Sequence, residues 1–88
     1  MKLGSRQHRM LEAIFKQPTP ANIAWSSAES LLKALGAEIS EGRGSRVRIH
    51  LRGVRAVFHR PHPQKEMHRG AVRSLRRFLI EAGVQSER

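Results

Sequence analysis

The chain has 88 residues, enough for a single domain, and a formal net charge of +10 at pH 7, which favours a polyanion or an acidic protein as its partner. It has no cysteine, which excludes disulfide bonds and thiolate zinc sites, and no apolar run near the roughly 18 residues of a membrane span, so we expect a cytoplasmic protein. All seven acidic residues are glutamates, and the lack of aspartate argues against a two-metal nuclease and a Ser-His-Asp arrangement, so we expect no metal or cofactor.

Two helices are predicted in the first half of the chain. The first spans residues 5–16, because its apolar residues recur on one helical face, and it ends before a short connector that contains two prolines. The second begins at Ser26, which forms a capping box with Glu29, continues with an apolar stripe and ends at Gly36. The stripe of the second helix consists of Ala28, Leu31, Leu32 and Leu35.

Three strands follow. Residues 37–40 alternate between apolar and polar side chains and predict a short edge strand. Arg52 and Gly53 read as a two-residue hairpin turn between alternating runs, so Leu51 faces Val54. Carried outward, this register gives one apolar and one basic face. The apolar face pairs Ile49 with Ala56 and Val47 with Phe58, and the basic face pairs His50 with Arg55, Arg48 with Val57 and Arg46 with His59.

A last helix is predicted over residues 66–82, after a stiff loop in which His62 has a proline on each side. Arg69, Arg73 and Arg77 lie one turn apart on this helix, away from its apolar stripe. Like charges at this spacing repel by about 0.2 to 0.5 kcal/mol per pair, so the arginine stripe needs a reason, and we expect that reason to be an anion.

The element order predicts an α+β fold of two layers: helix, three strands and helix, preceded by an additional N-terminal helix. We expect residues 1–25 to form that helix and the connector. Residues 26–88 are then the main domain, and the chain is a single globular unit.

Residues 42–77 hold the excess charge. They contain eleven of the seventeen Lys and Arg residues and one carboxylate, Glu66. Such an imbalance exceeds what solubility requires and favours contact with an anion. The side chains that we expect to bind phosphate groups are Arg48, Arg55, Lys65, Arg69, Arg73 and Arg77.

Several short stretches resemble one known family. They are Leu31-Leu32-Lys33-Ala34-Leu35-Gly36, Gly44-Ser45, Pro61-His62-Pro63-Gln64-Lys65-Glu66, Arg69-Gly70-Ala71-Val72-Arg73-Ser74-Leu75 and Ala82-Gly83-Val84. In order and spacing they are similar to the HicA toxins of HicA/HicB toxin-antitoxin systems. The resemblance implies a double-stranded-RNA-binding-like α-β-β-β-α fold, metal-independent cleavage of mRNA, and neutralisation by a HicB-like acidic antitoxin.

The chain departs from the family at one position. Family members usually carry a histidine one or two residues after the Gly-Ser pair, and the resemblance implies that it activates the RNA 2′-hydroxyl; this chain has Arg46 and Val47 there. Because our register places His59 opposite Arg46, His59 is the candidate for the substitute base, with a solvated imidazole on the sheet face as the alternative role, and Arg46 is a candidate to stabilise the phosphorane. His62 matches the family loop and is a further catalytic candidate, with a hydrogen bond that fixes the loop as the alternative role.

Two functions remain open at this point. The first is the toxin of a type II toxin-antitoxin system, an mRNA endoribonuclease. The second is a non-catalytic RNA-binding or antitoxin-docking module of the same fold, which the missing histidine would explain. A basic DNA-associated or ribosomal protein is a third reading that rests on charge alone, since no helix-turn-helix or zinc signature supports it.

Overall fold

The computed structural model describes residues 3–85, which form three helices and one three-stranded antiparallel sheet. This arrangement confirms the predicted α+β class. In chain order the elements are α1 (Ser5–Phe15), α2 (Trp25–Ala34), β1 (Glu38–Glu41), β2 (Arg46–Leu51), β3 (Val54–His59) and α3 (Arg69–Glu81).

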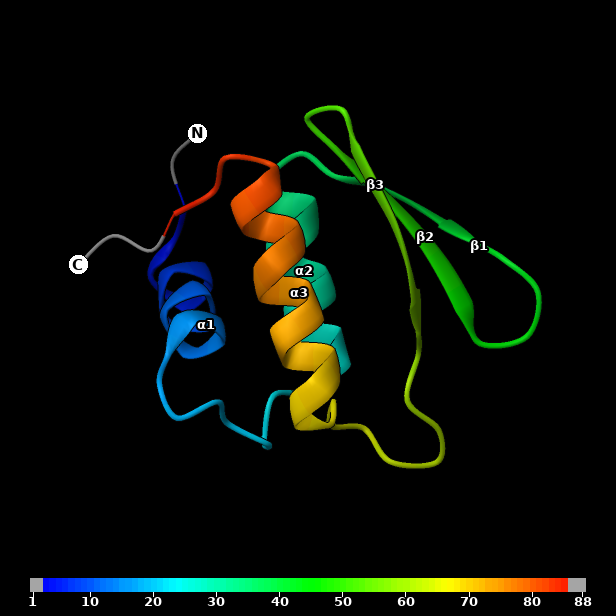
Figure 1. Cartoon of the computed structure of the whole chain (residues 1–88), viewed down its shortest axis with the longest axis horizontal. Helices are drawn as coiled ribbons and strands as arrows, with labels where there is room; N and C mark the ends of the chain where they lie inside the picture. The colour runs from blue at the N-terminus through cyan, green and yellow to red at the C-terminus, as the bar shows by residue number, and fades with distance from the viewer. Residues whose placement is uncertain (1–2, 86–88) are drawn as a thin grey trace.

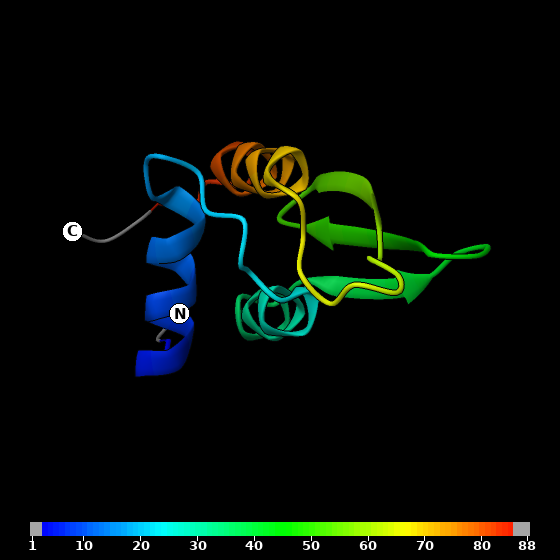
Figure 2. The same ribbon diagram turned by 90° about the horizontal axis from the view of Figure 1, so that it is seen from below.

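The elements are stacked in layers. Helices α2 and α3 lie side by side, run in the same direction and cover one face of the sheet, with β3 beside α3 (Figure 1). The added helix α1 crosses them on the side away from the sheet, so it forms a further layer (Figure 2). The other face of the sheet carries no helix, and we call it the open face.

The hairpin has the register expected from its turn. All six predicted cross-strand pairs are present, and the sheet order β1-β2-β3 makes β1 an edge strand, as predicted. Arg52 and Gly53 have φ of 50° and 83°, the positive values that a two-residue type I′ turn requires. Side chains alternate across a strand, so every second residue of β2 packs under the helices and the intervening residues reach the open face. The buried set of β2 is Val47, Ile49 and Leu51.

The start of α2 differs from the prediction. The prediction of a capping box formed by Ser26 and Glu29 is wrong. Ala24 is the N-cap, and no side chain forms a capping hydrogen bond at the start of this helix. The N–H of Trp25 instead donates to the carbonyl oxygen of Lys65 at 3.0 Å, a partner that lies far away in the sequence. The predicted apolar stripe is buried, and Gly36, at φ 96°, follows the last turn.

The start of α3 also differs from the prediction. The helix begins at Arg69 rather than Glu66, because the residues before it extend along the connector. The N–H of Met67 donates to the carbonyl oxygen of Ile23 at 2.8 Å, and the Met67 side chain is buried. His68 then becomes the N-cap, and its Nδ1 accepts a hydrogen bond from the first turn of the helix.

The helix α1 shares the core of the main domain. Its residues Leu11 and Ile14 are buried in the same apolar cluster as the sheet and the other helices. Arg76 of α3 donates to the carbonyl oxygens of Ile14 at 2.9 Å and Lys16 at 3.1 Å, and to Thr19 Oγ1 at 3.2 Å. One guanidinium therefore joins α3 to the end of α1 and to the connector.

Candidate functional site

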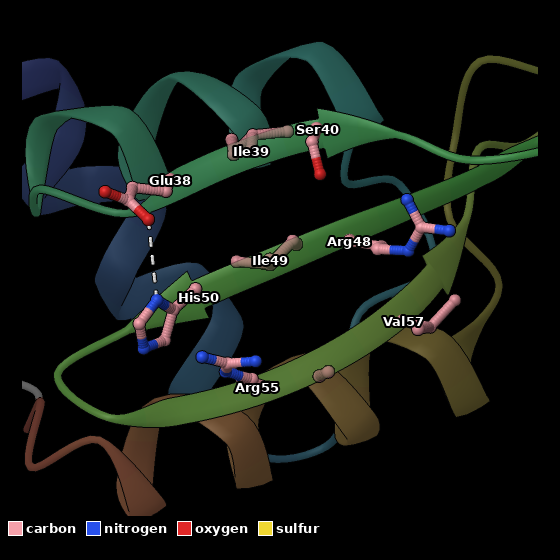
Figure 3. Close-up of a pocket in the computed structure, with 9 residues that line it drawn as sticks. Glu38, Ile39, Ser40, Arg48, Ile49, His50, Arg55 and Val57 are labelled. Atoms are coloured by element: carbon pink, nitrogen blue, oxygen red, sulfur yellow. Dashed lines mark ion pairs between the residues drawn. The ribbon is translucent and has the colours of Figure 1, made fainter.

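The open face of the sheet is basic and concave. Figure 3 shows Arg48, His50, Arg55 and Val57 on this face, with the helices behind the sheet. The guanidinium groups of Arg48 and Arg55 form no hydrogen bond or ion pair with any residue that the structure describes. Two of the predicted phosphate ligands therefore lie on one accessible surface.

The edge strand β1 places one carboxylate, that of Glu38, on the open face. Glu38 is paired with His50 in the β1–β2 register, and its Oε1 lies 3.5 Å from His50 Nδ1 (Figure 3). The sequence register stopped at the hairpin, so the pair was missed. Extending the alternation of β1 across the sheet is the signal that finds it.

The predicted Arg46–His59 pair is present at the end of the hairpin. The two residues are cross-strand partners, and both are exposed on the open face. His59 Nδ1 lies 3.3 Å from Ser45 Oγ. When the Nδ1–H donates to this hydroxyl, Nε2 keeps its lone pair and can accept a proton. The main chain supports the geometry, because the N–H of Arg60 donates to the carbonyl oxygen of Ser45 at 2.8 Å.

Arg60 is turned toward the helix side of the sheet and is engaged there. Its guanidinium donates twice to the carboxylate of Glu41, at 3.0 and 2.9 Å, and lies 3.9 Å from Glu29 Oε2. The hydrogen bond and the charge of Arg60 hold the pKa of Glu41 below its ordinary value, and the same hydrogen bond raises the pKa of Arg60. This arginine closes the gap between β1 and α2.

The predicted stripe on α3 divides in two. Arg73 and Arg77 are exposed and pair with none of the residues in the described range 3–85. Arg69, in contrast, donates from Nε to the carbonyl oxygen of Thr19 at 3.1 Å, so part of its guanidinium is used inside the protein. Lys65 is exposed in the loop before α3.

His62 is exposed in the same loop as Lys65. Within the described chain its side chain makes no hydrogen bond, so the structure does not show the loop-fixing bond that was the alternative role. His62 and Lys65 line a hollow beside Arg60. The structure thus brings Arg46 and His59 together and leaves His62 in a separate hollow.

The open face of the sheet and the exposed side of α3 that carries Arg73 and Arg77 meet at a groove that was not predicted from the sequence. The groove runs between the outer edge of β3 and α3. Its lining includes His59 and Phe58 from the strand and His68, Ser74 and Arg77 from the segment of α3. His59 therefore stands where the open face and the α3 surface join.

The described residues offer neither a metal-binding cluster nor a membrane-spanning helix. Residues 3–85 contain no group of three His or Glu side chains that could hold a metal ion. No helix in the same part of the chain is long and apolar enough to cross a membrane.

The chain was also compared with known proteins. The profile of a family described as "HicA toxin of bacterial toxin-antitoxin" matches residues 25–84. Searches of curated proteins and of solved structures returned no significant match. The family match covers more than half of the chain, from the first residue of α2 to just beyond α3, and leaves α1 outside. This chain belongs to the HicA toxin family of bacterial toxin-antitoxin systems.

Proposed function

We propose that this protein is the toxin of a type II toxin-antitoxin system that cleaves mRNA in the cytoplasm without a metal or cofactor and is neutralised by a HicB-like acidic antitoxin. Membership of the toxin family supports the general role. The observation that carries the ribonuclease activity is the Arg46–His59 pair, with Ser45 Oγ 3.3 Å from the imidazole.

The reaction that this geometry supports is an internal transesterification. His59 Nε2 takes the proton from the RNA 2′-hydroxyl while Ser45 holds the other ring nitrogen. The 2′-oxygen forms a bond to the adjacent phosphorus, and the bond from phosphorus to the 5′-oxygen breaks. The departing 5′-oxygen takes up a proton from water, which leaves a 2′,3′-cyclic phosphate and a 5′-hydroxyl, and the His59 imidazolium returns its proton to the resulting hydroxide. Arg46 stabilises the negative charge that develops on the phosphorane oxygens.

The exposed basic side chains place the RNA. Arg48 and Arg55 contact phosphate groups along the open face, and Arg73 and Arg77 extend this track onto α3. Lys65 and the free part of Arg69 add contacts at the loop. The proposed phosphate ligands are the exposed residues Arg48, Arg55, Lys65, Arg69, Arg73 and Arg77.

The test is incubation of the purified protein with RNA in EDTA, followed by analysis of the new ends. We expect 2′,3′-cyclic phosphates, and we expect His59→Ala to lower the rate by about 10² to 10⁴-fold, the usual contribution of a positioned base. His50→Ala is the matched control, because His50 is also on the open face but paired with Glu38. Full activity of His59→Ala, or intact RNA at high protein concentration, would contradict the proposal.

A second function is favoured by one observation: Arg46 occupies the position where the family histidine is expected. In that case the fold serves as an RNA-binding or antitoxin-docking module without catalysis. RNA affinity would then fall steeply with salt, expression would not arrest growth, and no histidine substitution would change either result. Growth arrest that requires His59 would rule it out.

A further inference from the structure

The outer edge of β3 carries unpaired main-chain groups. In an antiparallel ladder the hydrogen-bonded pairs alternate along the strand, and a two-residue turn makes Leu51 and Val54 such a pair. The bond from the N–H of Arg60 to Ser45 fits the same alternation. Every second residue between these ends therefore points its N–H and C=O away from β2. These residues are Arg55, Val57 and His59.

A groove lies directly beside this edge. On its far side α3 presents Gly70, Ala71 and Ser74, and the small size of these side chains leaves space next to the strand. No residue that the structure describes bonds to the outward main-chain groups of β3. Natural sheets cover, shorten or twist such edges, since an open edge is a template for another strand.

The other edge of the sheet is different. The strand β1 has four residues, against six in β3, and includes two glutamates. The gap behind it is bridged by Arg60, which joins Glu41 to Glu29. The edge at β1 is short, acidic and closed toward α2, whereas the edge at β3 is longer, basic and open toward α3.

The side chains around the β3 edge indicate what would bind there. Val57 is 55% exposed, one of two large apolar side chains exposed on the described surface, and it lies at the centre of the edge. Arg55 lies two residues earlier on the same strand, Arg77 lines the groove, and Glu81 is the one carboxylate in the groove lining. A second copy of this chain would bring two arginine-rich β3 edges together, and the net charge of +10 on each chain disfavours that pairing. An extended segment that alternates acidic and apolar residues matches this edge, because its carboxylates complement the arginines and its apolar side chains complement Val57.

We propose that an acidic, extended segment of a protein partner adds to β3 as a fourth strand, lies in the groove beside α3, and covers His59. Main-chain hydrogen bonds to Arg55, Val57 and His59 would hold the segment, and its carboxylates would face the arginines. The expectation that the bound segment blocks RNA cleavage rests on the proposed ribonuclease function. The addition of the segment to β3 does not depend on that function.

The probe for this inference is a synthetic acetylated peptide of alternating Glu and Val residues, titrated into the full-length, ¹⁵N-labelled chain. We expect the amide signals of Arg55, Val57 and His59 to shift and their hydrogen exchange to slow by about tenfold or more, since strand addition protects an N–H. A Lys-Val peptide and a Glu-Val peptide that is N-methylated on one edge are the matched controls. Both should leave these amides unchanged.

The variant Val57→Pro removes one outward N–H without touching the bonds to β2, and Val57→Thr is its control. We expect Val57→Pro to abolish peptide binding and Val57→Thr to retain it. If Val57→Pro does not fold, the N-methylated peptide tests the same hydrogen bonds. Equal binding of the N-methylated peptide, or protection confined to β1, would overturn the inference. Failure of the wild-type chain to cleave RNA would reject the proposed function and leave this result intact.

Discussion

The arginines of residues 42–77 fall into two groups that the sequence alone does not distinguish. In one group the guanidinium has an acceptor inside the protein: Arg52, Arg60, Arg69 and Arg76. In the other group the guanidinium bonds to none of the described residues: Arg43, Arg46, Arg48, Arg55, Arg73 and Arg77. The first group holds the elements together, although we also assign the free part of Arg69 to RNA. The second group, apart from Arg43, forms the surface that we assign to RNA.

The internal acceptors explain the division. Arg76 reaches carbonyl oxygens at the end of α1, a helix with no basic residue in its own last turn. Arg52 lies 3.5 Å from the carbonyl oxygen of Ala82, the C-cap of α3. The last carbonyls of a helix lack intrahelical partners and carry partial negative charge, so a cation from a neighbouring element satisfies them. Positive charge in this chain therefore has a structural use beside its proposed use at the surface.

Among the arginines, the largest expected effect belongs to Arg46 in the second group. Arg46→Ala should lower the rate of RNA cleavage by about 10² to 10³-fold, because it removes a donor to the charged transition state. Arg43→Ala, in the preceding turn, is the control and should stay close to the wild-type rate. Single-turnover cleavage assays measure both. A loss with Arg43→Ala equal to that with Arg46→Ala would show that overall charge, not the position opposite His59, matters.

The next effect belongs to Arg76 in the first group. Arg76→Ala should lower the free energy of unfolding by about 2 to 3 kcal/mol, since it leaves carbonyl oxygens at the end of α1 without their charged donor. Arg73→Ala, one turn earlier on the same helix, should change it by less than about 0.5 kcal/mol. Urea unfolding of the two variants provides the comparison. If Arg76→Ala and Arg73→Ala had equal free energies of unfolding, the distinction between structural and surface arginines would be contradicted.

A smaller effect is expected from the open face. The double variant Arg48→Ala/Arg55→Ala should reduce the slope of log affinity against log salt by about 1.4, or roughly 0.7 for each lost phosphate contact to single-stranded RNA. Its unfolding free energy should match that of the wild type. Fluorescence titrations of a 2′-O-methyl RNA at several salt concentrations give the slope without cleavage. An unchanged slope would mean that this face does not bind phosphate.

The smallest effect concerns pH. Because the folded-state pKa of Glu41 is lowered by Arg60, its stabilising contribution is present above its ordinary pKa of 4.5 and is lost as the pH falls through the folded value. The stability difference between wild type and Glu41→Gln should therefore be present at pH 7 and decrease as the pH falls below 4.5 and through the lowered folded-state pKa. Unfolding curves across this range measure it, with Glu12→Gln as the control. A difference that grows on acidification would contradict the pairing.

The local features of the fold were predictable from sequence. The turn at Arg52 and Gly53 fixed the hairpin register, and that register placed His59 opposite Arg46. The errors came from long-range main-chain bonds. The N–H groups of Trp25 and Met67 find carbonyl partners in distant loops, so a local capping signal at Ser26 and a local helical pattern at Glu66 were overridden.

The partition of the arginines was not predictable for the same reason. Arg76 and its acceptor Ile14 are 62 residues apart, and nothing in the local sequence of α3 identifies that contact. The groove beside β3 depends on how α3 packs against the edge of the sheet, which no strand pattern contains. Residue pattern thus gave the two faces of the sheet, whereas tertiary packing decided which charges remain available on the surface.

The most direct test of the account is an NMR titration that follows arginine Nε–H signals and the His59 ring while a non-cleavable RNA is added to the wild-type chain. The RNA carries a 2′-O-methyl group at each nucleotide, so binding is observed without reaction. We predict that the signals of Arg46, Arg48, Arg55 and His59 shift together, and that those of Arg60 and Arg76 remain in place. Shifts confined to Arg60 and Arg76, or a His59 ring that does not respond, would contradict the account.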